Sequence, residues 1–416
     1  MDEKEKAGWI VVAGGVLINL MLGVTYTWSV FAGPLMELYK WSQTEVQLAF
    51  SIMLAMFAVF TIVGGRIQDR RGPKVVALAG GLLLGAGFVA TSLFATTPLM
   101  LYLTYGALVG AGVGLAYVTP IAAGVKWFPQ RKGLVNGIIV FGFGFGSLVL
   151  APVAKELIVS QGVMQTFLLL GLVFAVAVGA GALLLKNPPE AKAKKGKKAD
   201  AKDGNYGPMA MMRTPAFWML WLMFAFAAAA GLMVIGNLAT FAKLSFITEH
   251  GMAEDAAFSL AALAVGALAV FNGAGRIFAG WLSDRFGRQK TMLLMFGAQT
   301  FLVAGVVFVS GFSPWALFGV MALIGLCFGA NFSLFPSACA DYFGVKNTGV
   351  NYGLLFTSYG VGGIVGPQVM AYLLDSATAS AGALSVSSYT LPFLLIGGLV
   401  GVAAIISLFA KSPHSK

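Results

Sequence analysis

Twelve stretches of mainly apolar residues recur along the chain, and they constrain its fold more than any other feature. A helix of about 20 such residues, rising 1.5 Å per residue, crosses the roughly 30 Å hydrocarbon core of a bilayer. We expect membrane-spanning helices near residues 8–33, 44–66, 74–95, 98–126, 133–155, 164–186, 216–242, 256–281, 290–311, 314–340, 349–374 and 389–410. The chain is therefore predicted to be an all-α membrane protein embedded in a lipid bilayer.

The overall composition supports this prediction and excludes other classes. The 416 residues are 58% hydrophobic and only 10% charged, and a soluble protein could not solvate such a surface. The two histidines, His250 and His414, fall in a loop and in the tail, and no phosphate-binding loop motif occurs. We therefore predict no metal site and no cofactor. The polar N-terminal segment before residue 10 is too short for a cleaved signal, so the first span is expected to remain.

The basic residues lie mainly on one side of the predicted membrane. With both termini in the cytoplasm, 23 of the 27 Lys and Arg residues are cytoplasmic, as the positive-inside rule requires. Lys40, Lys155 and Lys243 fall outside, and Arg276 falls within the membrane. The excess positive charge thus indicates topology and gives no reason to expect a nucleic-acid partner. A prokaryotic cytoplasmic (inner) membrane is the expected location.

A lysine-rich segment divides the chain into two halves. Residues 1–186 and 216–416 each hold six predicted spans, and residues 187–215 form a basic linker between them. Such a segment is typical of a solvated tether, and contact with anionic lipid headgroups is the alternative.

The two halves repeat each other at a constant offset. Gly65–Lys74 between spans two and three matches Gly280–Lys290 between spans eight and nine, 215 residues further on. A second set, Pro120, Trp127, Gly133, Gly137 and Pro152, recurs at 215 or 216 residues as Pro336, Tyr342, Gly349, Gly353 and Pro367. Parallel repeats of this kind imply two pseudo-symmetric six-helix halves around a central cavity.

The repeated loop resembles the signature of the major facilitator superfamily, G-x-x-x-D-R-x-G-x-K. The resemblance covers essentially the whole chain and implies a twelve-helix major facilitator fold. The aspartates lie at helix ends among arginines, where they can cap or clamp neighbouring helices as conformational latches without touching substrate. The motif residues assigned to this role are Gly65, Asp69, Arg70, Gly72, Gly280, Asp284, Arg285 and Gly287.

Further motifs resemble one branch of this superfamily, the oxalate:formate exchangers and monocarboxylate transporters. These motifs, in chain order, are Gly23–Pro34, Gly110–Tyr117, Lys126–Gly133, Phe271–Arg276 and Asn351–Gly353. The resemblance implies a secondary transporter of small carboxylates, working by alternating access.

Arg276 is the one charged residue that cannot be placed outside an apolar stretch. A cation in hydrocarbon costs roughly 3 kcal/mol even on lenient scales. Arg276 precedes Asp284 by eight residues, which places it about 12 Å deeper along a helix. The alternative to a binding role is a side chain that snorkels to the cytoplasmic interface, and this depth puts the interface beyond its easy reach. It matches the arginine with which the resembled carriers hold a carboxylate, and its planar fork suits that task.

Three positions of the predicted cavity each depart from one group of the resembled carriers. Asn272, on the same helix face at i−4, replaces an aspartate thought to take part in proton coupling, and it can bond either substrate or the guanidinium. We expect no buried carboxylate elsewhere. Val30 and Tyr359 replace basic residues, so the site is expected to hold one cation and one monoanion, with the Tyr359 hydroxyl offering a polar contact.

Aromatic residues complete the predicted cavity. The candidates match cavity-lining positions of the resembled carriers and would favour a small anion with an apolar tail. Packing between helices or against lipid is the alternative for each, because the chain has 33 Phe. The candidate substrate-binding residues are Arg276, Asn272, Tyr117, Tyr359, Tyr26, Phe143, Phe328, Phe332 and Phe356. The glycine runs at 142–146 and 360–363 are expected to serve helix packing.

These features predict a monomeric, proton-coupled symporter of a lactate-like monocarboxylate. The first alternative is carboxylate:carboxylate exchange of the oxalate/formate type, because Asn272 leaves no proton-binding carboxylate beside Arg276. A membrane-embedded enzyme or sensor is the remote alternative, disfavoured by the lack of predicted buried catalytic or metal-binding clusters.

Overall fold

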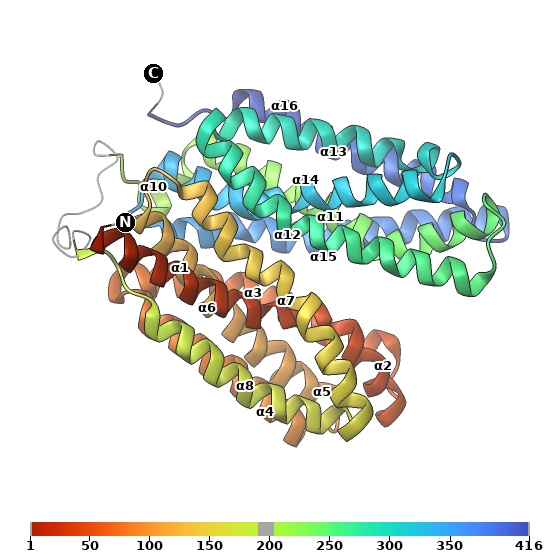
Figure 1. Cartoon of the computed structure of the whole chain (residues 1–416), viewed down its shortest axis with the longest axis horizontal. Helices are drawn as coiled ribbons and strands as arrows, with labels where there is room; N and C mark the ends of the chain where they lie inside the picture. Colours follow the sequence, from red (N-terminus) through yellow and green to blue (C-terminus); the bar gives the residue numbers. More distant parts are fainter. Residues whose placement is uncertain (1, 190–203, 415–416) are drawn as a thin grey trace. The chain divides into compact units, whose positions relative to one another are not determined.

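The computed structural model describes residues 2–189 and 204–414, and the secondary structure of these residues is helical throughout (Figure 1). Twelve helices in it are long and apolar enough to span a membrane. They agree with the twelve predicted spans in order and within several residues at each end. The bounds of the first half are α1 (Glu3–Leu22), η1 (Gly23–Thr27), α2 (Trp28–Tyr39), α3 (Gln43–Arg71), α4 (Pro73–Phe94), α5 (Pro98–Leu101), η2 (Tyr102–Val109), α6 (Gly110–Trp127), α7 (Lys132–Gln161) and α8 (Val163–Leu184).

The second half follows a short helix, α10 (Pro208–Met212). Its elements are α11 (Pro215–Thr248), α12 (Glu254–Phe286), α13 (Arg288–Ser310), α14 (Pro314–Phe343), α15 (Thr348–Ala381), η4 (Val386–Tyr389) and α16 (Thr390–Phe409). Pro120, Pro152, Pro336 and Pro367 lie inside helices, as the sequence predicted.

Two spans contain a change of helix type. The first span runs as α1, then the 3-10 segment η1, then α2, and the interruption falls on the Gly-Val-Thr-Tyr-Thr motif. The fourth span passes through the π-helical segment η2 before α6. Such departures from α-helical geometry recur at functional sites, and η1 carries the candidate residue Tyr26.

The helices form two compact units. Unit 1 comprises Met1–Thr214, Pro336–Thr357 and Ser412–Lys416, and unit 2 comprises Pro215–Phe335 and Ser358–Lys411. In unit 1, α4 packs on α8, α3 on α6 and α1 on α7 (Figure 1). In unit 2, α13 packs on α16, and α11 packs on α12 and α16. The end of α14 and the beginning of α15 thus belong to the unit built by the N-terminal helices.

The glycine runs lie at helix contacts, as predicted. A methyl group at Gly142 would come within 2.6 Å of the Val16 carbonyl oxygen of α1. A methyl group at Gly362 would come within 2.5 Å of the Ala225 carbonyl oxygen of α11. Only a residue without a side chain lets these backbones approach so closely.

Candidate functional site

Arg276 lies on α12 of unit 2, with 1% of its surface exposed. Its Nε and Nη2 atoms both donate to Oδ1 of Asn272, at 3.2 Å and 3.0 Å. The two residues are one helical turn apart, so α12 alone brings them together. Of the two roles that the sequence left open for Asn272, the structure therefore shows the contact with the guanidinium.

Phe332 of α14 packs on the same guanidinium. The Cζ atom of Arg276 lies 4.3 Å from the centroid of the Phe332 ring, within cation–π range. A desolvated contact of this kind contributes about 2 kcal/mol. Arg276 is therefore fixed along one edge by Asn272 and on one face by Phe332.

Glycines allow α12 and α14 to approach closely enough for this contact. A methyl group at Gly329 would overlap the carbonyl oxygen of Asn272 itself. Methyl groups at Gly275 and Gly325 would likewise overlap backbone atoms of the facing helix, at Leu326 and Leu268. The register of these three glycines sets Phe332, three residues after Gly329, opposite the turn that carries Arg276.

An aromatic cluster in unit 2 surrounds Phe332. Its ring centroid lies 5.6 Å from that of Phe328, 5.5 Å from that of Tyr359 and 6.4 Å from that of Phe224. Unit 2 thus brings together five predicted site residues: Arg276, Asn272, Phe328, Phe332 and Tyr359. Phe224 was not predicted, because it lies in an apolar run of α11 where nothing distinguishes it from other core residues.

The other four candidates lie together in unit 1. Tyr117 packs against Phe143 at 5.4 Å and Phe356 at 5.2 Å, and Tyr26 packs against Phe143 at 5.1 Å, between ring centroids. Two further residues join this cluster that the sequence did not single out for it. The Phe57 ring lies 5.2 Å from that of Tyr117, and the Tyr352 hydroxyl lies 3.5 Å from the Tyr117 hydroxyl.

The aspartate of the first signature loop caps a helix that is distant in the sequence. Asp69 accepts hydrogen bonds from the backbone N–H groups of Gly349 at 3.2 Å and Val350 at 2.9 Å, in the first turn of α15. A negative charge is favourable there because the first amides of a helix lack partners within it. Lys126 lies 3.5 Å from the same carboxylate. The carboxylate thus caps the N-terminus of α15, while its role as a conformational latch stays a prediction.

Asp69 also corrects one expectation. Its side chain is only 6% exposed, so a carboxylate is buried after all. The burial arises because the beginning of α15 covers the end of α3. A methyl group at Gly65 would overlap Gly349 and lie 2.7 Å from the Val350 nitrogen, which explains the need for a glycine at this motif position.

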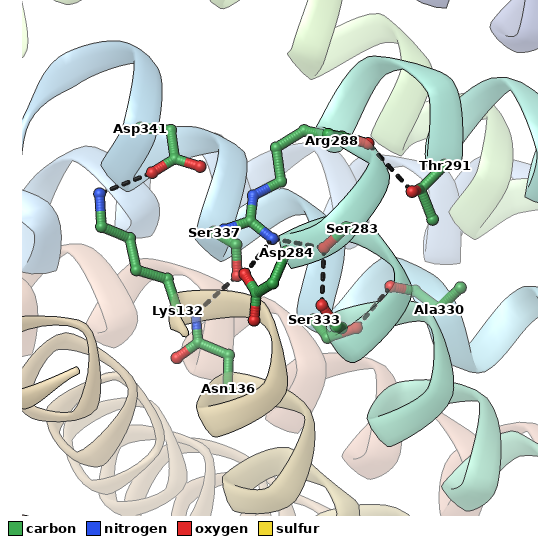
Figure 2. Close-up of polar contacts among 12 residues, drawn as sticks. Lys132, Asn136, Ser283, Asp284, Arg288, Thr291, Ala330, Ser333, Ser337 and Asp341 are labelled. Carbon is green, nitrogen blue, oxygen red and sulfur yellow. Dashed lines mark hydrogen bonds and ion pairs between the residues drawn. The ribbon is translucent and has the colours of Figure 1, made fainter. Parts of the chain in front are cut away.

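Two more polar contacts join α7 to the end of α14 within unit 1 (Figure 2). Lys132 Nζ donates to Asp341 Oδ1 at 2.6 Å, and Asn136 Nδ2 donates to Ser337 Oγ at 3.0 Å. The paired residues are 209 and 201 positions apart in the chain. Nothing in the sequence indicates these pairs.

The second signature loop lies in unit 2. Asp284 pairs with Arg288 at 2.7 Å, and Arg288 also donates to the Ser283 hydroxyl (Figure 2). Arg285 lies over the Trp281 ring, whereas Arg70 of the first loop is exposed. Gly72 and Gly287 have φ angles of +94° and +91°, which only glycine adopts without strain. Gly280 is buried.

Comparison with known proteins identifies the family to which this chain belongs. Residues 14–367 match the model of the Major Facilitator Superfamily. The chain is 31% identical over 370 residues to an uncharacterized MFS-type transporter, YhjX, of Escherichia coli (strain K12), covering 86% of this chain and 87% of that protein. It is 30% identical over 359 residues to the oxalate:formate antiporter of Oxalobacter formigenes, covering 86% and 83%.

Two further matches extend the comparison. Monocarboxylate transporter 11 of Homo sapiens is 28% identical over 407 residues, covering 94% of this chain and 80% of that protein. The crystal structure of the Escherichia coli fucose:proton symporter FucP superposes with a TM-score of 0.70 at 17% identity, covering 97% and 99%. The latter match shows the fold alone.

The chain belongs to the major facilitator superfamily, in the branch that includes the oxalate:formate antiporter and the monocarboxylate transporters. It is an integral membrane transporter with the twelve-helix fold of that superfamily.

Proposed function

We propose that this transporter carries a small monocarboxylate and binds its carboxylate group through Arg276. The observation that supports the proposal is a guanidinium buried in the membrane-spanning part of unit 2, held by the neutral Asn272 and the Phe332 ring. Neither neighbour carries a charge that would offset the cation. A substrate carboxylate would do so with two charge-assisted hydrogen bonds.

The contacts of Asn272 favour one approach for the substrate. Asn272 bonds the edge formed by Nε and Nη2, so a carboxylate is expected at the edge formed by the two terminal nitrogens. The substrate tail would then meet the aromatic rings of the same unit. We propose a lactate-like acid because Phe224, Phe328 and Phe332 reward an apolar tail, while the Tyr359 hydroxyl offers a contact to a 2-hydroxyl group.

A monoanion is favoured over a dianion by charge. The three rings that pack on Phe332, those of Phe224, Phe328 and Tyr359, are uncharged, and Arg276 brings one positive charge to the cluster. A second carboxylate buried against these rings would need a further cation, and without one it would cost several kcal/mol. The Tyr117 cluster of unit 1, with Tyr26, Phe143 and Phe356, is proposed as a second group of cavity residues.

We propose that transport proceeds by alternating access with proton symport, the termini facing the cytoplasm. The signature loops act as latches in this scheme. Parting α3 from the start of α15 must break the cap that Asp69 forms on Gly349 and Val350. Carboxylate exchange is the second candidate. The neutral Asn272 favours it, because the side chain that accepts from Arg276 one helical turn away is an amide, which cannot take up a proton as a carboxylate can.

Transport into proteoliposomes tests both proposals. Wild-type protein is expected to take up radiolabelled L-lactate under an inward proton gradient, and Arg276→Ala should abolish saturable binding and uptake. Arg213→Ala, which removes an exposed arginine outside both signature loops, is the matched control. Binding to Arg276→Ala within a few-fold of wild type would refute the site. Uptake only into vesicles preloaded with carboxylate would favour exchange over symport.

A further inference from the structure

We infer that Gly231 of α11 positions the arginine site through the ring of Phe328. The inference rests on the proposed role of Arg276 and adds a residue of α11 that acts on the guanidinium through two aromatic rings. The residues involved lie on three helices of unit 2. Gly231 is on α11, Phe328 and Phe332 are on α14, and Arg276 is on α12.

Phe328 lies directly on the α11 backbone at Gly231. A methyl group at Gly231 would come within 2.6 Å of Phe328 Cγ and would overlap the ring at Cδ2 and Cε2. Gly231 itself is buried. The ring therefore occupies the volume that any side chain at position 231 would need, and it would have to move by roughly 1 Å to admit even a methyl group.

Local helix propensity gives no reason for a glycine at this position. Gly231 follows Ala227, Ala228, Ala229 and Ala230, all buried in the same helix. A glycine inside a helix costs about 1 kcal/mol relative to alanine, and the φ of Gly231 is not positive. The Phe328 ring is what requires a residue without a side chain at position 231, because it fills the space of the methyl group.

A displaced Phe328 would disturb the arginine through Phe332. The Phe328 and Phe332 rings are nearly perpendicular, at 84°, with centroids 5.6 Å apart, and the Phe332 face covers Arg276 at 4.3 Å. Little room is left for α14 to shift toward α12, because even a methyl group at Gly325 or Gly329 would overlap α12 backbone atoms. We therefore expect the adjustment in the side chains, where the Phe332 ring packs on that of Phe328.

Gly231→Ala and Gly236→Ala form a matched pair of variants for the test. Both lie on α11, but a methyl group at Gly236 would meet no atom within 4 Å. In the purified full-length protein, Gly231→Ala should weaken L-lactate binding by about tenfold, whereas Gly236→Ala should leave it within a factor of two. Adding Phe328→Leu to Gly231→Ala frees the required space and should recover part of the lost affinity, a non-additive result.

A second readout does not depend on the substrate. The rate at which phenylglyoxal modifies Arg276, followed by mass spectrometry, should rise several-fold in Gly231→Ala, because the guanidinium loses the cover of Phe332. Equal labelling rates and equal lactate affinity in Gly231→Ala and Gly236→Ala would overturn the inference. A lower melting temperature of Gly231→Ala with unchanged labelling rate and unchanged lactate affinity would overturn it as well. If Gly231→Ala does not fold, Phe328→Leu alone must raise the labelling rate; an unchanged rate overturns the inference. If wild type binds no lactate, the proposed function fails, while the labelling result still decides the role of Gly231.

Discussion

Replacing Asn272 by aspartate tests how the charge of Arg276 is used. The substitution keeps nearly the same shape and places a carboxylate oxygen where Oδ1 now accepts from Nε and Nη2, at 3.2 Å and 3.0 Å. The guanidinium would then form an internal ion pair in place of two bonds to a neutral amide. A substrate carboxylate would have to compete with this fixed anion for the same cation.

The size of the effect follows from Coulomb's law. Two unit charges about 4 Å apart interact by about 4 kcal/mol at an effective dielectric constant of 20. The new carboxylate would also repel the substrate anion from a somewhat greater distance. If one third to two thirds of this energy opposes binding, affinity for a monocarboxylate should fall by roughly tenfold to a hundredfold. Protonation of the introduced group removes the penalty, so affinity should recover as the pH falls.

Equilibrium binding of L-lactate to purified protein between pH 5.5 and 8 provides the assay. Asn272→Asp should bind weakly at pH 8 and more tightly at pH 5.5, with a steeper pH dependence than wild type. Asn272→Leu is the control, since it removes the same hydrogen bonds without adding charge and should weaken binding equally across the range. If Asn272→Asp matched wild type at every pH, the reasoning about the charge of Arg276 would be wrong.

Two other substitutions test neighbouring parts of the structure. Tyr359→Lys adds a second cation to the aromatic cluster and should shift preference toward dicarboxylates; competition by oxalate against labelled lactate measures the shift, and no gain for oxalate would contradict the placement of Tyr359. Lys132→Asp should destabilise the protein by about 1 kcal/mol or less, because the pair with Asp341 is only partly buried. The exchanged pair Lys132→Asp with Asp341→Lys should recover most of the loss in thermal unfolding, and a swap no more stable than the single variant would show that the contact contributes little.

The features that the sequence predicted well are those with a local signal. The twelve spans follow from runs of apolar residues, and Arg276 stands out because a charge inside such a run is costly. The contact with Asn272 follows from a spacing of four residues on one helix.

The missed features depend on packing between distant segments. Phe57 and Phe224 look like any other aromatic residue of an apolar helix until the neighbouring helices are in place. Tyr352 stands in the motif Asn351–Gly353, but its contact with Tyr117 is not evident from the motif. The burial of Asp69 is of the same kind. Its position at the end of α3 is evident from the sequence, but the covering turn of α15 comes from 280 residues away.

The cap formed by Asp69 leaves two backbone hydrogens whose exchange would report a separation of α3 from α15. The amide hydrogens of Gly349 and Val350 are held by a side chain of another helix, not by a carbonyl within α15. Every separation of α3 from α15 exposes these two hydrogens to solvent exchange while the rest of α15 keeps its own ladder of bonds. The rate of deuterium uptake by the peptide that contains them would therefore report how readily this end of the molecule opens, without an attached probe or a transported substrate.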